Sequence, residues 1–265
     1  MAAISSPAPR LEVGQAVTAT FAILRRDWFM FLAFAVPLGI GPQMLARVIL
    51  ALPSVQSVTQ SSPATQFTVS FGISFLMTFA PSSILAGIII ERILTDARGQ
   101  RSSFPQCLSV SLGRAPVLMG ALFFQKLAVG IGLVILVVPG VLMSLAWAVL
   151  LPVIVAERAS LLSCFRRSAE LTSGVRGRIF GFSLAVGLIA VLLGVLAGFV
   201  IGFGMGLLHM VPPAGTLHGF LIGFYGAVGS TIASVIGIAG SAVLYMVLRR
   251  EREGGAVGSL ASVFD

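Results

Sequence analysis

Residues 115–156 read APVLMGALFFQKLAVGIGLVILVVPGVLMSLAWAVLLPVIVA, and this stretch decides the fold. Its only ionisable side chain is Lys126. A single helix of this length would extend about 63 Å, roughly twice the thickness of the hydrocarbon core of a bilayer. The run must therefore turn, and the Pro139-Gly140 pair predicts where it does so. We expect two membrane spans joined by a short turn.

The rest of the chain has the same apolar character. Hydrophobic residues make up 57% of the 265 residues, charged residues only 10%, and the mean hydropathy is +1.04. Such a chain has too little polar surface to face water as a soluble globule. We expect an all-α, polytopic membrane bundle that forms a single domain over residues 1–265, with short flexible tails at about 1–10 and 251–265.

Six segments are apolar enough to cross a bilayer, although the fourth is short. They are residues 28–50, 67–90, 116–138, 141–156, 179–208 and 219–248. A tilted or partly re-entrant fourth segment is the alternative, which would leave five spans and a re-entrant loop.

Basic residues lie in alternate gaps between these segments. The opposite loops, around residues 52–66, 137–141 and 209–219, contain no Lys or Arg. The positive-inside rule then places both termini in the cytosol, and we expect a multi-pass protein of the cytoplasmic membrane. The net charge of +8 reflects this orientation rather than nucleic-acid binding. Two cysteines, Cys107 and Cys164, are too few for a disulfide framework, and we expect both thiols on the reducing, cytosolic side.

Each of the three predicted hairpins follows a cytosolic helical stretch, which suggests a repeated unit. These stretches are residues 12–27, 104–114 and 159–172. In the third, Leu162, Phe165 and Ala169 share one helical face, and Gly174 is a plausible stop. This helix either orients two spans as a loop helix or lies flat against lipid headgroups.

The third stretch and the span before it carry a recognisable pattern: a Pro-Gly pair, a Trp in mid-span, a Pro and then a Glu, and finally R-R-S-x-E-L-x-x-G. The matching positions are Pro139, Gly140, Trp147, Pro152, Glu157, Arg167, Ser168, Glu170, Leu171 and Gly174. The pattern resembles the membrane-domain family associated with glycerophosphoryl diester phosphodiesterases and related bacterial multi-span proteins of unknown function. Ala169 departs from the bulky aromatic residue often found there.

The resemblance implies a fold and a location in a bacterial inner membrane, and it hardly implies an enzyme. Some relatives carry a fused phosphodiesterase domain, but this chain has no room for its barrel. His209 and His218 are the only histidines, and two histidines without a nearby carboxylate or thiol are a weak metal signal. We therefore expect no metal, no cofactor and no catalytic residues.

Several charged residues are candidates for binding or for a structural collar at the cytosolic ends of the spans. We expect Arg167 to pair with Glu157 or Glu170, beside Arg166. Glu91 and Glu157 could serve as an acid–base pair only if they were close together, and pairing with neighbouring arginines is the simpler reading. Lys126 lies deep in a span, where it is either functional or reaches the cytosolic surface through its long stem.

Glycine recurs every fourth residue in the fifth segment, at Gly194, Gly198, Gly202 and Gly206. A face of bare backbone lets another helix approach closely. The partner is either the sixth segment of the same chain or a second protein in the membrane.

No nucleophile–base set, phosphate-binding loop or mid-membrane carboxylate accompanies these features. The sequence favours a non-enzymatic membrane scaffold, accessory subunit or lipid-interacting module, with membrane lipids, a homo-oligomer or a membrane protein as partners. The main alternative is a transporter for a lipid-like or small solute, with its site near the broken third and fourth segments. An intramembrane enzyme ranks third.

Overall fold

The computed structural model describes residues 12–100, 104–207 and 216–261, and within those ranges it is helical, with no strand. The elements are α1 (Val13–Arg26), α2 (Trp28–Ala35), the π-helical turn η1 (Val36–Ile40), α3 (Gly41–Leu50), α4 (Pro53–Thr59), α5 (Pro63–Ala97), α6 (Phe104–Ile135), α7 (Val137–Ala146), α8 (Leu150–Glu157), α9 (Leu161–Thr172), α10 (Arg176–Leu207) and α11 (Thr216–Ala261). The all-α prediction is confirmed.

Six helical stretches in the described ranges are long and apolar enough to cross a membrane. They are Trp28–Leu50, Pro63–Ala97, Pro105–Ile135, Val137–Glu157, Arg176–Gly204 and Gly219–Glu253. The prediction of six candidate spans is therefore confirmed, with the helices generally longer than the apolar segments that predicted them. The protein is a polytopic helical membrane protein.

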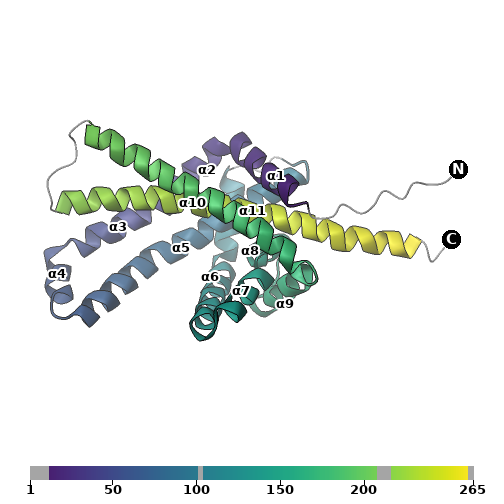
Figure 1. The fold of residues 1–265 in the computed structure, drawn as a ribbon, viewed down its shortest axis with the longest axis horizontal. Coiled ribbons are helices and arrows are strands. Elements are labelled where there is room, and N and C mark those ends of the chain that lie inside the picture. Colours follow the sequence, from purple (N-terminus) through teal and green to yellow (C-terminus); the bar gives the residue numbers. More distant parts are fainter. Residues whose placement is uncertain (1–11, 101–103, 208–215, 262–265) are drawn as a thin grey trace.

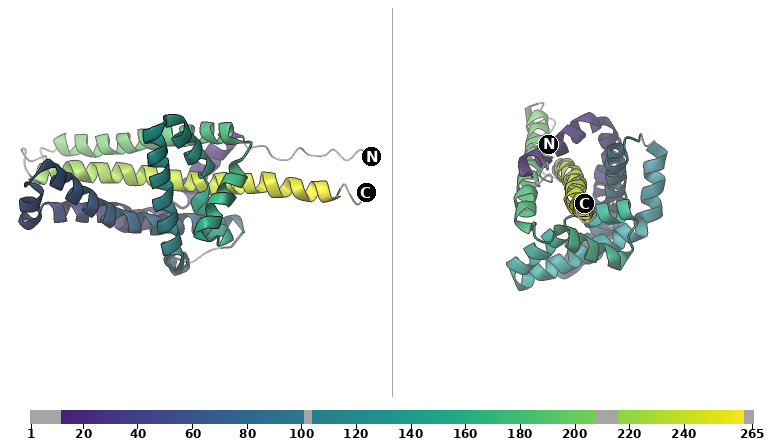
Figure 2. Two further views of the ribbon diagram at one scale, coloured as in Figure 1. Left: turned by 90° about the horizontal axis from the view of Figure 1, so that it is seen from below. Right: turned by 90° about the vertical axis from the view of Figure 1, so that its right-hand side faces the viewer.

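The long helices do not all run in one direction. Helices α5, α10 and α11 follow the long axis of the molecule (Figure 1). Helix α6 instead runs across α10 and α11, as the left panel of Figure 2 shows. The turn between α6 and α7 therefore does not lie at the end of the molecule where α4, the end of α10 and the start of α11 lie.

The turn itself also differs from the prediction. The helix breaks at Leu136, whose backbone is extended, and Pro139 and Gly140 lie in the first turn of α7. A proline is tolerated there because the first N–H groups of a helix have no partner within it. Gly140 is needed for packing instead, since a Cβ at this position would lie 2.6 Å from the backbone nitrogen of Leu133 in α6.

Only two of the three expected cytosolic helices are separate elements. Helices α1 and α9 match residues 12–27 and 159–172, but residues 104–114 form the beginning of α6. Gly113 and Pro116 weaken a helix without ending it, and neighbouring apolar residues continue its packing. Helix α11 also continues to Ala261, so that residues 251–261 are helical rather than an irregular tail. Residues 1–11 lie outside the described ranges.

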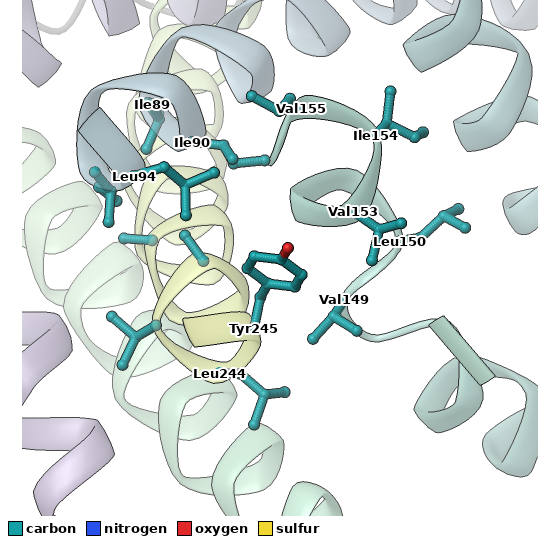
Figure 3. Packing of buried hydrophobic residues seen from close by; sticks show 14 of the residues in the cluster. Ile89, Ile90, Leu94, Val149, Leu150, Val153, Ile154, Val155, Leu244 and Tyr245 are labelled. Atoms are coloured by element: carbon teal, nitrogen blue, oxygen red, sulfur yellow. The ribbon is translucent and has the colours of Figure 1, made fainter. Parts of the chain in front are cut away.

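The packed core lies toward one end of the bundle, where α5, α8 and α11 meet (Figure 3). Its fully buried side chains include Ile89 and Ile90 of α5, Val153 and Ile154 of α8, and Tyr245 of α11. Toward the other end the helices expose large apolar side chains, such as Phe67 and Phe71 of α5 and Phe199 of α10. Such surface is stable in hydrocarbon and not in water, which supports the membrane assignment.

Candidate functional site

Charged and polar side chains from three helices meet at the end of the bundle where α9 lies. Glu157, at the end of α8, accepts hydrogen bonds from Arg167 Nε at 3.0 and 3.2 Å. It also accepts one from the buried hydroxyl of Tyr245 at 3.0 Å. Arg167 reaches Glu253 at 3.0 Å, and Arg249 pairs with the same carboxylate at 2.7 Å. We call these five residues the charged collar; they connect α8, α9 and α11.

A break in the fourth candidate span lies directly beside the collar. Helix α7 ends at Ala146 and α8 begins at Leu150, so the regular helical hydrogen bonds stop between them. Backbone N–H groups of the turn bind the carbonyl groups of Met143 and Leu145. The hydroxyl groups of Ser168 and Thr172, both fully buried, donate to the carbonyl oxygen of Ala146 at 3.0 and 3.1 Å. Gln125 of α6 donates to the carbonyl oxygen of Trp147 at 3.2 Å. Side chains and the backbone N–H groups of the turn together satisfy the carbonyl groups at the break.

The R-R-S-x-E-L motif of α9 has a structural explanation in these contacts. Arg167 and Ser168 face the bundle, where they bind the ends of α8 and α7 respectively. Arg166 and Glu170 face outward and form an exposed pair at 3.6 Å. Arg167 therefore pairs with Glu157, and Glu170 pairs with Arg166. One face of the motif holds the broken span together, while the other is solvated.

A second group of charges, which the sequence did not single out, joins the first and second candidate spans. Asp27, between α1 and α2, contacts Arg92 of α5 at 3.1 Å and Arg26 at 2.9 Å. Arg26 also reaches Asp96 of α5 at 2.6 Å. The sequence did contain a signal for these ion pairs. Asp27 directly precedes the apolar segment that begins at Trp28, and a carboxylate at the edge of a span needs a charged or hydrogen-bonding partner.

These contacts shift the protonation equilibria of groups outside the spans. Burial raises the pKa of Asp27, but hydrogen bonds from Arg26 and Arg92 outweigh it, so the pKa lies below its ordinary value. The hydrogen bond to Glu157 raises the pKa of Arg167. Burial raises the pKa of the Cys164 thiol to about 11, which leaves it a weak nucleophile.

Other sequence candidates lie apart from the collar. Lys126 is on the exposed surface of α6. Glu91 accepts a hydrogen bond from Thr95 at 3.2 Å, whereas Glu157 binds Arg167, so the two glutamates have separate partners. Within the described ranges, no group of three or more His, Cys, Asp and Glu residues could hold a metal ion. His209 lies outside the described residues, as does the side chain of His218.

The glycine face of α10 meets α11, with one point of very close approach. A Cβ at Gly194 would lie 2.9 Å from the carbonyl oxygen of Gly229, and a Cβ at Gly229 would lie 2.9 Å from that of Gly194. Gly198 and Gly202 face Tyr225 with ordinary spacing, at 3.9 Å and 3.6 Å. The surroundings of Gly206 lie outside the described residues. Among the described glycines of this face, the tight backbone contact is that of Gly194 with Gly229. Farther along the helix pair, a Cβ at Gly240 of α11 would lie 3.2 Å from the side chain of Val186.

Two adjoining cavities lie along α10 and α11, and we call them together the α10–α11 groove. The first also borders Ser144 and Leu145 of α7, and the second contains the Gly194–Gly229 contact. Their volumes are about 440 and 400 Å³, and both are lined by Ala190, Val191 and Ala233. The described lining residues are glycine, small or apolar side chains and a few hydroxyl groups, and none is charged. Ser144 and Ser241 already donate to backbone carbonyl groups at 2.7 and 2.8 Å. The groove therefore suits an apolar occupant.

Fold and site together define a polytopic helical membrane protein with a broken fourth span, held by a capping helix and a charged collar. The chain is 31% identical over 118 residues to the UPF0259 membrane proteins of Yersinia pestis (strain Pestoides F) and Yersinia pseudotuberculosis (serotype O:3, strain YPIII). The match covers 43% of this chain and 45% of each relative, so the chain spans about half the length of the curated relatives it matches.

The names of these relatives state a membrane location and give no activity. No family model matches the chain, and no solved structure matches it. The resemblance to the phosphodiesterase-associated membrane domain therefore stays a prediction. What the comparisons add is a second, independent indication of a membrane protein.

Proposed function

We propose that this chain is a non-enzymatic protein of the cytoplasmic membrane that binds lipid, with an acyl chain seated in the α10–α11 groove. The supporting observation is the groove itself, whose described lining residues are largely apolar and carry no charge. Exposed apolar side chains such as Leu184, Leu188 and Val195 lie on the same helix. In a bilayer this surface meets hydrocarbon, so acyl chains are the molecules at hand to fill the groove.

A transporter with a site at the broken span receives less support. Discontinuous helices in transporters present unpaired carbonyl groups to a substrate or coupling ion. Here Ser168, Thr172 and Gln125 bind the carbonyl groups at the break. Lys126, the charged residue expected at such a site, is on the exposed surface of α6. The break is therefore better explained as a rigid joint than as a transport site.

Crosslinking with a phospholipid that carries a photoreactive group in its acyl chain tests the proposal. In nanodiscs, crosslinks should concentrate on residues 183–198 and 225–241, which line the groove. Ala233→Phe should reduce them severalfold because it fills the part shared by both cavities. Ser234→Phe, on the neighbouring exposed position, is the matched control and should leave them unchanged. Crosslinks spread evenly over α5 and α10, or equal effects of the two variants, would contradict lipid binding in the groove.

The orientation proposed with this function has its own test. Both native cysteines are buried, so an added surface cysteine gives a clean signal. Ser61→Cys, exposed beside α4, should react with an impermeant maleimide applied to intact spheroplasts. Labelling only after the membrane is opened would reverse the orientation and leave the groove proposal standing.

A further inference from the structure

Three arginines line a cleft at the arginine-rich end of α11. The cleft lies between the end of α5 and α11, has a volume of about 340 Å³, and contains Arg98, Arg249 and Arg250. Its remaining lining residues are Leu94, Ala97, Tyr245, Met246 and Glu253. Glu253 is the only carboxylate among them, so the cleft carries a net positive charge.

The one carboxylate does not neutralise the three arginines. Glu253 already pairs with Arg167 at 3.0 Å and with Arg249 at 2.7 Å. Among the residues that the structure describes, neither Arg98 nor Arg250 has a carboxylate within ion-pair distance. Arg98 follows the last residue of α5, and both Arg98 and Arg250 line the cleft and are exposed. Arg250 also lines the neighbouring cavity between α1 and α11, which contains Glu12. Two guanidinium groups are thus available to an external anion.

The cleft also has an apolar side, formed by Leu94, Ala97 and Met246, and it lies where α11 leaves the apolar part of the bundle. A phosphate group suits paired guanidinium groups, which bind its oxygen atoms in a bidentate manner. A soluble anion would not use the apolar side. A basic pocket between membrane helices at this level is a recognised geometry for a phospholipid headgroup.

We propose that this cleft binds the phosphate group of an anionic phospholipid, with the glycerol end of the lipid against Leu94 and Met246. The site is separate from the α10–α11 groove, so this proposal extends the proposed lipid-binding function to a second place and concerns the headgroup rather than the acyl chain. Arg98 and Arg250 hold the phosphate, while Arg249 is shared between Glu253 and the cleft.

Native mass spectrometry of the full chain in mild detergent, titrated with phosphatidylglycerol or phosphatidylcholine, tests the proposal. The wild-type protein should bind phosphatidylglycerol more tightly. The double variant Arg98→Gln/Arg250→Gln should weaken that binding about thirtyfold, since each basic residue near an anionic membrane surface contributes about fivefold to the affinity. The double variant Arg166→Gln/Arg176→Gln is the control: it removes the same charge from exposed positions that do not line the cleft.

Three outcomes would overturn the headgroup site. Equal loss of affinity in both double variants would show that only the overall charge matters. Equal affinity for the two lipids would show no headgroup selectivity. Complete displacement of the lipid by millimolar inorganic phosphate would assign the cleft to a free anion. Acyl-chain crosslinking in the same Arg98→Gln/Arg250→Gln variant should stay at the wild-type level, which separates failure of this site from failure of the groove.

Discussion

Replacing Gly194 by alanine should separate α10 from α11, because its Cβ would lie 2.9 Å from the carbonyl oxygen of Gly229. Ordinary van der Waals contact begins at about 3.4 Å, so the two backbones must move apart by about half an ångström. The obstacle is backbone on a neighbouring long helix, and no flexible side chain can turn aside to relieve it. The perturbation therefore spreads along the whole helix pair.

The magnitude follows from two opposing effects. Overpacking a close contact costs about 1–3 kcal/mol, while replacing glycine by alanine within a helix recovers up to about 1 kcal/mol. Gly194→Ala should thus lower the free energy of unfolding by roughly 0–2 kcal/mol. Gly198→Ala is the matched control, because its Cβ would meet Tyr225 at an ordinary 3.9 Å. Gly198→Ala gains the same helix propensity without an overpacking cost. The free energies of unfolding of the two variants should therefore differ by about 1–3 kcal/mol.

Thermal unfolding in one mild detergent, followed by circular dichroism, measures this difference. The Tm of Gly194→Ala should lie on the order of 5 °C below that of Gly198→Ala. Gly229→Ala should resemble Gly194→Ala, because its Cβ would meet the carbonyl oxygen of Gly194 at 2.9 Å. The fall in Tm of the double variant Gly194→Ala/Gly229→Ala should be smaller than the sum of the falls of the two single variants, because the first alanine already separates the helices. Equal Tm values for Gly194→Ala and Gly198→Ala would refute the reasoning.

Three further predictions concern the ends of the helices. Arg167→Glu should lower the yield of folded protein; adding Glu157→Arg should restore part of it, and adding Glu170→Arg should not, because Glu170 pairs elsewhere. Ser168→Ala should lower the free energy of unfolding by about 1–3 kcal/mol in denaturant titrations, since it removes a buried donor to Ala146. The depressed pKa of Asp27 means that its ion pairs contribute full stability above about pH 4 and lose it as the pH falls through the folded-state pKa. Asp27→Asn should therefore flatten the acidic part of a Tm-against-pH curve.

Controls are available for each of these variants. Ser163→Ala, an exposed position on the same helix as Ser168, should leave stability unchanged. Rescue of Arg167→Glu by Glu170→Arg instead of Glu157→Arg would show that the collar is paired differently. If the Tm of Asp27→Asn fell with decreasing pH as steeply as that of the wild type, the ion pairs of Asp27 would contribute nothing to the stability of the folded state.

Local properties of the chain were predictable from the sequence. Apolar runs of sufficient length identify spans, because the bilayer requires about 20 apolar residues for each crossing. Six candidate spans and the boundaries of α9 followed from this rule and from helical periodicity. The alternation of Arg and Lys between spans is also local information, although the orientation that it predicts stays a prediction.

The remaining features depend on contacts between distant residues. The hydrophobic pattern of α6 identifies an apolar helix but carries no direction, so its course across α10 and α11 could not be predicted. Pro139-Gly140 marks a turn to within a few residues only, because a proline is equally acceptable in the first turn of the helix that follows. The bond from Ser168 to Ala146 joins residues 22 positions apart, and nothing in the local pattern distinguishes this serine from an exposed one.

The most direct test of lipid binding is an experimental structure of the full chain in nanodiscs made from phosphatidylglycerol and phosphatidylethanolamine. We expect density for an acyl chain along the α10–α11 groove, in contact with Ala190 and Ala233, where the two cavities adjoin, and passing over the Gly194–Gly229 contact. A groove closed by direct packing of α10 against α11 along its length, or one filled by a segment of a second protein, would contradict the account.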